Sequence, residues 1–221
     1  MILPNRPYKR EAPSKDAKSV FIFCEGKRRE YQYFRYFREL DTRINIEVYE
    51  LHEHEDNSPL GLFNIAKESI IKSDDNPDPK YNFIEGDEVW IVFDRDLDKL
   101  DSRAPQIAAV KESCSKTDGW NHAISNPCFE VWLYYHEYSD MPNDMSASPS
   151  WWKQLVADNI KSGFDSRRHP LLIETARNNS KKNFKLVDDI PDIGCTEVHR
   201  LADTILPLVK GKLDKVLNEI S

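Results

Sequence analysis

The chain has 221 residues, with 31 lysines and arginines against 38 aspartates and glutamates, which gives a formal net charge of −7. A protein that coats nucleic acid without sequence preference is usually basic, because counterion release from neutralised phosphates supplies most of its affinity. Any contact with nucleic acid should therefore be local, or should depend on a partner. Hydrophobic residues make up 39% and aromatics 11%, which is enough for a sizeable core and argues against extensive disorder.

Several features predict a cytoplasmic protein. No apolar run is long enough to cross a bilayer, and no signal-peptide stretch opens the sequence. The four cysteines are scattered without a CxxC pair, which argues against a zinc ribbon and for reduced thiols. We therefore expect no membrane contact, while the oligomeric state stays open.

The order of apolar runs predicts the fold class. Residues 1–18 are polar and contain prolines, and we expect an N-terminal arm there. Four expected strands then alternate with helical segments: SVFIFC, KRREYQYFRYFREL, NIEVYEL, LGLFNIAKESIIK, EVWIVFD, APQIAAVKESCS, HAISNP and CFEVWLYYHEY. This alternation predicts a Rossmann-like α/β core over residues 19–140, with a mostly parallel sheet. Residues 141–221 show only helical periodicity, in WWKQLVADNI, PLLIETARNN and TEVHRLADTILPLVKGKLDKVLNEI. We expect them to form a helical C-terminal lobe packed on the core.

Two expected strands end in carboxylates. Glu25 follows the first strand, and Asp94, Asp96 and Asp98 come at the end of the third. Ligands of open α/β sheets bind at the carboxyl ends of strands, and residues two apart on an extended chain share a face. If the first and third strands are neighbours, Glu25, Asp94 and Asp96 should meet, with Asp98 at the edge. Crowded carboxylates repel one another unless a cation lies between them, and hard oxygen donors favour Mg²⁺ or Mn²⁺ over zinc.

Residues near these acids could contact a phosphate or the metal. Gly26 permits close approach of the backbone, although an ordinary turn glycine would look the same. Lys27 follows it in the sequence. Asn126 is a good helix N-cap with Pro127 at the first helical position, so a helix should begin at the rim that carries the acids. Glu130, in the first turns of that helix, could then reach the metal as a further catalytic residue.

The remaining basic residues give a weaker signal. Arg167 and Arg168 could contact nucleic acid, but a short basic cluster is more often a solvated surface. An Asp-x-Asp pattern by itself is weak as well. The second acid at the end of another strand, Glu25, is what favours a site over a solvated loop.

Three blocks, FCEGKRREYQYF, ISNPCFEVWLYYHE and CTEVHRLADTIL, resemble the RloB-like family, and the carboxylates resemble the Toprim domain of topoisomerases, primases and OLD-type nucleases. The resemblance implies a Toprim-type nuclease, often encoded beside an ABC/AAA-type ATPase in restriction or phage-defence loci, including abortive infection. It also implies that Glu25 is a general acid/base or shared ligand and that Asp94 and Asp96 are Mg²⁺ ligands. One departure is Arg29, where the family usually has threonine, and it puts in question the role of the first helix's start.

Two other functions compete with this one. A haloacid-dehalogenase-type phosphatase would use Asp94 as its nucleophile, but that motif generally opens its fold and continues differently from Asp98. A non-catalytic adaptor of an ATPase would use the acids as a docking face. The sequence leaves open whether the nucleic acid is DNA or RNA, where it would be cut, and whether one metal or two are used.

Overall fold

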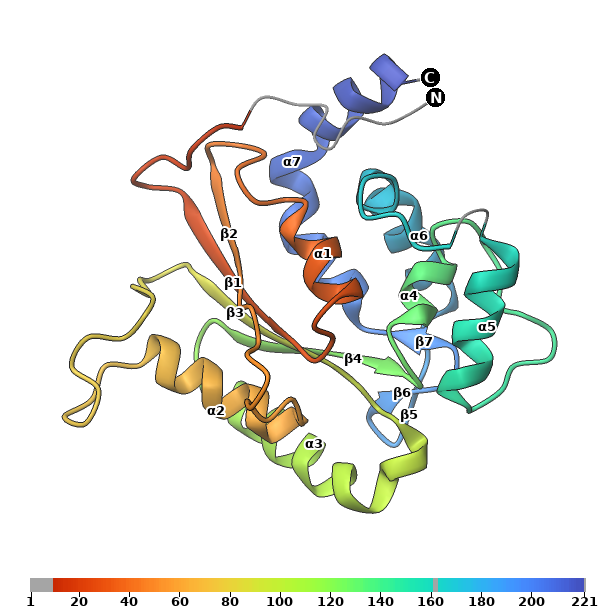
Figure 1. Cartoon of the computed structure of the whole chain (residues 1–221), viewed down its shortest axis with the longest axis horizontal. Helices are drawn as coiled ribbons and strands as arrows, with labels where there is room; N and C mark the ends of the chain where they lie inside the picture. The colour runs from red at the N-terminus through yellow and green to blue at the C-terminus, as the bar shows by residue number, and fades with distance from the viewer. Residues whose placement is uncertain (1–9, 161–162, 221) are drawn as a thin grey trace.

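The computed structural model describes residues 10–160 and 163–220, so residues 1–9 of the expected N-terminal arm lie outside the described residues. Its centre is a five-stranded sheet in the order β2-β1-β3-β4-β7 (Figure 1). The strands are β1 (Lys18–Cys24), β2 (Ile44–Val48), β3 (Glu88–Asp94), β4 (Trp120–Asn126) and β7 (Cys195–Thr196). The first four are parallel, and β7 pairs antiparallel with β4. The chain is thus an α/β protein with a mostly parallel sheet, which confirms the predicted fold class.

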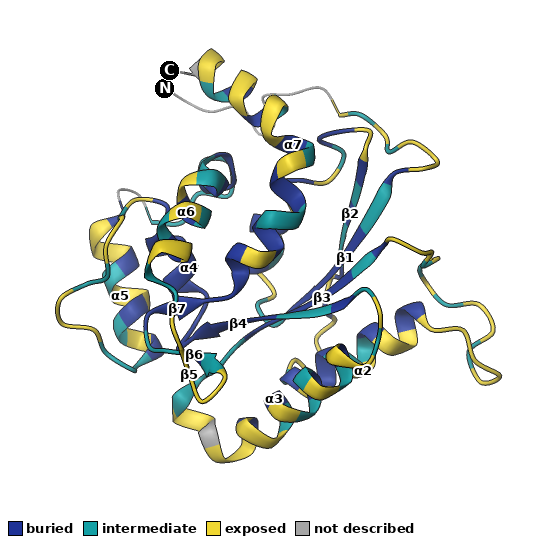
Figure 2. Ribbon diagram, turned by 180° about the vertical axis from the view of Figure 1, so that it is seen from behind, coloured by how far each residue is buried: buried dark blue, intermediate teal, exposed yellow. Residues whose placement is uncertain are grey.

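Helices cover both faces of the sheet. The helices α2 (Pro59–Ile70) and α3 (Leu100–Ser115) lie on one face, while α1 (Arg29–Arg35), α4 (Glu130–Tyr134) and α7 (Val198–Ile220) lie on the other (Figure 1). Alternate residues of β1 divide between them, with Phe21 and Phe23 in one hydrophobic cluster and Val20 and Ile22 in the other. The strands are therefore buried on both sides (Figure 2). This explains why they are continuously apolar instead of alternating.

Local sequence accounts for the start of α2. Ser58 is its N-cap, and its hydroxyl oxygen accepts a hydrogen bond from the amide of Gly61 at 3.2 Å. Pro59 occupies the first helical position, where no intrahelical donor is needed. The helical segment expected over LGLFNIAKESIIK is confirmed.

The order of the strands reverses at β1. The chain passes from β1 through α1 to β2 on one side, and from β2 through α2 to β3 on the other side of β1. Cys24 is in register with Val92, and the amide of Glu25 donates to the carbonyl of Val92 at 3.0 Å. The first and third strands are therefore neighbours, which is the condition for Glu25 to lie near Asp94. Their carboxyl ends mark the point where open α/β sheets bind ligands.

The region after residue 140 is not purely helical. It contains α5 (Pro149–Asn159), η2 (His169–Leu172) and α6 (Ile173–Asn183), then β5 (Leu186–Val187), β6 (Ile190–Pro191) and β7 before α7. The expectation that strands end at residue 140 is wrong, because strands of two residues are too short to show any periodicity. The late helices nevertheless share a hydrophobic cluster with the core: Leu201 and Ile205 of α7 pack with Val20 and Ile22.

The helix expected at Asn126-Pro127 begins later. Strand β4 continues through Asn126, and α4 begins at Glu130 without a side-chain cap. Asn126 is fully buried, and its amide group donates to the carbonyl of Pro191 at 2.7 Å. Its predicted N-cap role is wrong because its side chain holds the segment of β6 instead. Within the described residues, no helix is both long and apolar enough to cross a membrane.

Candidate functional site

A pocket of about 580 Å³ opens at the carboxyl ends of β1 and β3. Four acidic side chains line it, and they come from β3, α4 and the segment from the end of β1 into α1: Glu25, Glu30, Asp94 and Glu130. Four basic residues also line it: Lys27, Arg28, Arg29 and Lys153. Gly26 and Asn57 complete the wall. The fold thus gathers acids and bases from distant parts of the sequence at the strand-order reversal.

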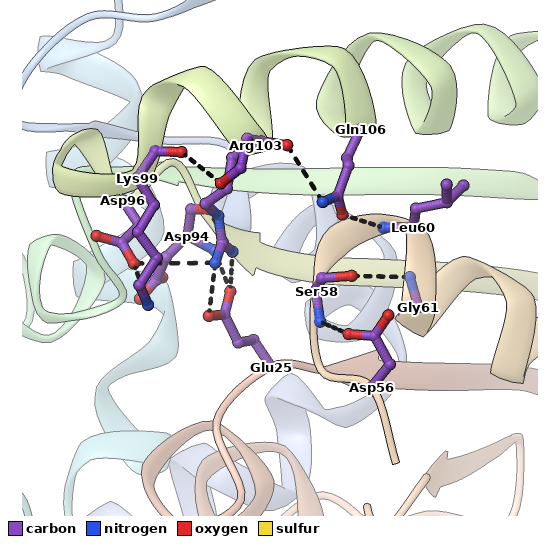
Figure 3. A network of polar contacts seen from close by, with 11 residues as sticks. Glu25, Asp56, Ser58, Leu60, Gly61, Asp94, Asp96, Lys99, Arg103 and Gln106 are labelled. Carbon is purple, nitrogen blue, oxygen red and sulfur yellow. Dashed lines mark hydrogen bonds and ion pairs between the residues drawn. The ribbon is translucent and has the colours of Figure 1, made fainter.

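Arg103 holds Glu25 at the end of β3 (Figure 3). Its guanidinium donates to both carboxylate oxygens of Glu25, with Nη1 to Oε1 at 3.1 Å, and Nη2 also donates to the carbonyl of Asp94 at 3.0 Å. The amide of Asp94 donates to Oε2 of Glu25 at 3.2 Å. The Arg103 side chain is only 7% exposed. A buried guanidinium therefore ties the ends of two neighbouring strands together through one carboxylate.

Asp94 carries a high proton affinity. Burial raises the pKa of the Asp94 carboxyl well above its usual range, and the negative charges of Glu30, Glu25 and Glu130 raise it further. Arg103 opposes this shift. The acids are therefore close enough to feel one another, as the sequence predicted for crowded carboxylates.

Glu30 lies directly against Gly26. A Cβ atom at position 26 would lie 1.7 Å from Oε2 of Glu30, so the absence of a side chain at Gly26 makes room for this carboxylate. Glu30 is buried, and burial together with Glu130 and Glu25 raises its pKa to about 7. Gly26 thus has a packing role that differs from the phosphate approach suggested by the sequence.

Glu130 reaches the same pocket from α4. It is buried and forms an ion pair with Arg29, the residue that replaces the family's usual threonine. The structure therefore brings Glu130 together with Glu25 and Asp94. It also shows what Arg29 contacts: this arginine provides the counter-charge for an acid about a hundred residues away.

Asp96 and Asp98 do not line the pocket. Strand β3 ends at Asp94, and Asp96 has a left-handed φ of 45°, so the argument that Asp94 and Asp96 share a face of one extended chain is wrong. Asp96 instead pairs with Lys99 at 3.0 Å and lies 3.9 Å from Nη1 of Arg103. Asp98 is exposed on the short helix η1 (Leu97–Lys99). Direct metal ligation by these two residues stays a prediction.

A family model described as RloB-like protein matches residues 20–205. The chain belongs to the RloB-like protein family. The matched range includes every residue that lines the pocket, together with Arg103. No curated protein and no solved structure matches the chain.

The donor chemistry of this RloB-like protein fits a hard divalent cation. The acids of the pocket supply only carboxylate oxygens, the ligands that Mg²⁺ and Mn²⁺ prefer. Burial is the main cause of the raised pKa values of Asp94 and Glu30, and the neighbouring carboxylates add to it; a bound cation would favour the charged form of both groups. In residues 10–160 and 163–220 as arranged, no three His, Cys, Asp or Glu side chains are grouped to hold an ion. Two of the acids are neutralised by Arg103 and Arg29 instead.

The other predicted phosphate contacts differ in their placement. Lys27 lines the pocket, although its ammonium donates to the carbonyl of His52 at 2.8 Å. Asn126 is fully buried, so a phosphate cannot reach its side chain, and the predicted phosphate contact of Asn126 is wrong. Arg167 pairs with Asp165 at 3.0 Å and Arg168 with Glu137 at 2.9 Å, and neither lines the pocket.

Sequence reasoning missed several residues of the site in this RloB-like protein. Arg103 and Lys153 stand in helices α3 and α5 with no neighbouring motif to distinguish them. Glu30 carried a usable signal, because it stands in the first turn of the helix, four residues after Gly26, and so lies close to the end of β1. Arg29 was noted only as a departure from the family pattern.

Proposed function

We propose that this RloB-like protein is a Toprim-type nuclease that hydrolyses phosphodiester bonds with Mg²⁺ or Mn²⁺. The observation that carries the proposal is the convergence of Glu25, Asp94 and Glu130 on one pocket at the reversal of a parallel sheet. Glu25 and Asp94, at adjacent strand ends, are the residues that would hold the cation. Bound there, the cation would supply Lewis-acid activation of the phosphodiester and of water.

The basic side of the pocket supports a phosphate-bearing substrate. Arg28 stands before α1 and Lys153 on α5, and both line the pocket with exposed side chains. In the part of the chain that the structure describes, neither makes an ion pair or a side-chain hydrogen bond. Both are therefore available to an incoming phosphate group, for which arginine offers a planar fork and lysine a point charge.

Glu30 is suited to proton exchange in this reaction. A group transfers protons most effectively when its pKa lies near the working pH, and the pKa of Glu30 is raised to about 7. Its carboxyl could take a proton from an attacking water or return one to a leaving oxygen. Glu130, paired with Arg29, lines the same pocket and would orient water or substrate.

The biological setting follows from the family resemblance and belongs to the proposal. We place the nuclease in phage defence, including abortive infection, with an ABC/AAA-type ATPase as partner and DNA or RNA as substrate. The chain's net charge of −7 supports a partner, because an acidic protein gains little affinity for a polyanion by itself.

A cleavage panel tests the function. DNA, tRNA and nucleotides would be incubated with the protein, with Mg²⁺ or Mn²⁺, and with and without the neighbouring ATPase. Glu25→Gln should lower the cleavage rate roughly 100-fold or more with unchanged circular dichroism. Glu112→Gln is the matched control, because Glu112 is an exposed acid that does not line this pocket and pairs with Lys116 at 2.5 Å.

Other outcomes would favour the competing functions. An aspartyl-phosphate on Asp94, with activity on small phosphate monoesters, would indicate a haloacid-dehalogenase-type phosphatase. Binding to the ATPase without cleavage of any substrate would indicate an adaptor. Cleavage that survives Glu25→Gln undiminished would remove the proposed site.

A further inference from the structure

Arg103 contacts both residues that would hold the cation, Glu25 and Asp94. It lies on α3, 78 residues beyond Glu25, and its guanidinium reaches back across the ends of β1 and β3 (Figure 3). It binds both oxygens of Glu25, it binds the carbonyl of Asp94, and it lies 3.9 Å from the carboxylate of Asp96. The Glu25 carboxylate also accepts a hydrogen bond from the backbone amide of Asp94 at 3.2 Å.

Stability alone gives little reason for a buried arginine at this place. Removing two charges from water costs several kcal/mol per ion, and a buried ion pair often does no better than apolar side chains of the same volume. The Nε of Arg103 is buried and makes no hydrogen bond within the described residues, so the guanidinium does not use all of its donors. The two groups that are used, Nη1 and Nη2, are directed at Glu25 and at the end of β3.

The two-pronged contact fixes the direction of the Glu25 carboxylate. A guanidinium that binds both oxygens holds the carboxylate plane, which a single-point donor cannot do. A carboxylate has about four lone-pair sites, and three of those of Glu25 accept hydrogen bonds from Nη1 and Nη2 of Arg103 and from the Asp94 amide, which leaves one on the Oε1 side. That remaining side belongs to the pocket, which Glu25 lines with Asp94, Glu30 and Glu130.

We propose that Arg103 is a positioning residue that holds Glu25 against the end of β3 in the orientation needed to bind a divalent cation. This inference rests on the proposed function, since it assumes that Glu25 is a ligand. In this proposal, Arg103 favours cation binding by orienting the Glu25 carboxylate and not by its own charge. A positive charge at this place would by itself repel a cation, so the two contributions predict opposite effects on metal affinity when the arginine is replaced.

Binding of Mn²⁺ to the purified protein without substrate tests the proposal. Isothermal titration calorimetry would compare wild type with Arg103→Lys, which keeps the charge but loses the fork. Partners that orient metal ligands typically change metal affinity 10–100-fold when altered, so the dissociation constant should rise roughly 10-fold or more. Arg103→Gln, which removes the charge, should also weaken binding. Tighter binding in Arg103→Gln would show that charge dominates and would overturn the proposal.

Lys99→Gln is the matched control. Lys99 precedes α3 and pairs with Asp96 at 3.0 Å, so this change removes a nearby positive charge without touching Glu25. Its Mn²⁺ affinity should stay within about 3-fold of wild type. Equal weakening in Lys99→Gln and Arg103→Lys would overturn the positioning role.

A double variant separates positioning from a general loss of structure. If Arg103 acts through Glu25, Arg103→Lys should not weaken Mn²⁺ binding further in a Glu25→Gln background. A structural defect would instead lower affinity in both backgrounds by the same factor, and that result would overturn the proposal. In cleavage assays, Arg103→Lys should lower kcat and leave the KM for nucleic acid near that of wild type.

The outcomes also separate this inference from the nuclease assignment. If wild type binds Mn²⁺ in an Arg103-dependent way but cleaves no phosphodiester, the positioning role stands and the nuclease proposal fails. If wild type cleaves and the Arg103 variants bind Mn²⁺ and cleave equally well, the nuclease proposal stands and the positioning role fails. A wild type that binds no Mn²⁺ overturns both.

Discussion

The four acids of the pocket differ in how their charge is balanced. Glu25 and Glu130 each have a guanidinium partner, whereas Asp94 and Glu30 have raised pKa values. Protonation is therefore how the metal-free protein balances the last charges of the cluster. A bound cation would replace those protons, which makes both metal affinity and stability depend on pH.

Glu30 should give a measurable pH dependence of stability. Its pKa is raised to about 7 in the folded protein, against about 4.3 in an unfolded chain. Between these values only the folded state holds the proton, so its contribution to the unfolding free energy is fully present below about pH 4 and is lost as pH rises through 7. Glu30→Gln should remove that loss. Between pH 5 and pH 8, the unfolding free energy of the variant should therefore rise relative to that of wild type by on the order of 1–3 kcal/mol.

Urea unfolding in EDTA at both pH values would measure this difference. Glu112→Gln, an exposed acid remote from the pocket, serves as the control and should leave the pH dependence of wild type unchanged. A Glu30→Gln protein that loses as much stability as wild type between pH 5 and pH 8 would show that Glu30 is already ionised at pH 5.

The cost of a side chain at position 26 should depend on the Glu30 side chain. A Cβ at position 26 would collide with the Glu30 carboxylate at 1.7 Å, and that carboxylate is buried. Gly26→Ala should therefore cost roughly 1–3 kcal/mol, as overpacking typically does. In a Glu30→Ala background the same change should be neutral or slightly stabilising, because alanine restricts the unfolded chain more than glycine. Urea unfolding of wild type, the two single variants and the double variant would measure this coupling. A similar destabilisation by Gly26→Ala in both backgrounds would show that the steric clash is not with Glu30.

At the scale of the elements, Glu197 joins β4 to the segment that follows β7. Its carboxylate accepts a hydrogen bond from the amide of Ile124 at 3.0 Å, and its own amide donates to the carbonyl of Ile124 at 2.8 Å. Both residues are buried. The short strand β7 is thus held at the sheet by a side chain as well as by its own ladder.

Glu197→Ala should therefore destabilise the protein by roughly 1–3 kcal/mol, the cost of a buried amide without a partner. Glu197→Gln keeps an oxygen acceptor and should cost less. Chemical denaturation of both variants at pH 7 would measure the difference. Equal costs for the two variants would mean that the carboxylate's charge, through its ion pair with Arg200, matters more than the acceptor.

At the scale of the whole molecule, charge opposes the substrate. The net charge is −7, and acids line the pocket that a polyanion would have to reach. Of the four bases that line the pocket, Lys27 and Arg29 are engaged by His52 and Glu130, which leaves Arg28 and Lys153 for a phosphate. A nucleic acid approaching this surface meets repulsion that a bound cation only partly offsets.

The isolated protein should therefore cleave weakly until an ATPase partner presents the substrate. Cleavage by the protein alone would be compared with cleavage by the reconstituted pair, with and without ATP. We expect the pair with ATP to cleave at least about 10-fold faster at physiological salt, where long-range attraction is screened. Robust metal-dependent cleavage by the lone protein would contradict the need for a partner and leave the nuclease proposal standing.

The sequence by itself determined the architecture and one half of the site. Continuous apolar runs such as VFIFC and VWIVF form strands buried on both faces, because each face packs against helices. Glu25 and Asp94 were found because parallel strands place their ends at one edge, and this needs only the strand assignments. The two-residue strand β7 escaped prediction because it has no period to detect.

Only the tertiary structure decided which side chains accompany those two acids. Arg103 meets Glu25 across 78 residues, and Arg29 meets Glu130 across 101. Such contacts depend on crossover geometry and leave no local pattern. The same geometry excluded Asn126, whose good local capping sequence was overridden by its place at the end of a buried strand. Local sequence thus specifies the long strands and most helices, while the short strands, the start of α4 and the charge balance of the pocket arise only when distant elements pack together.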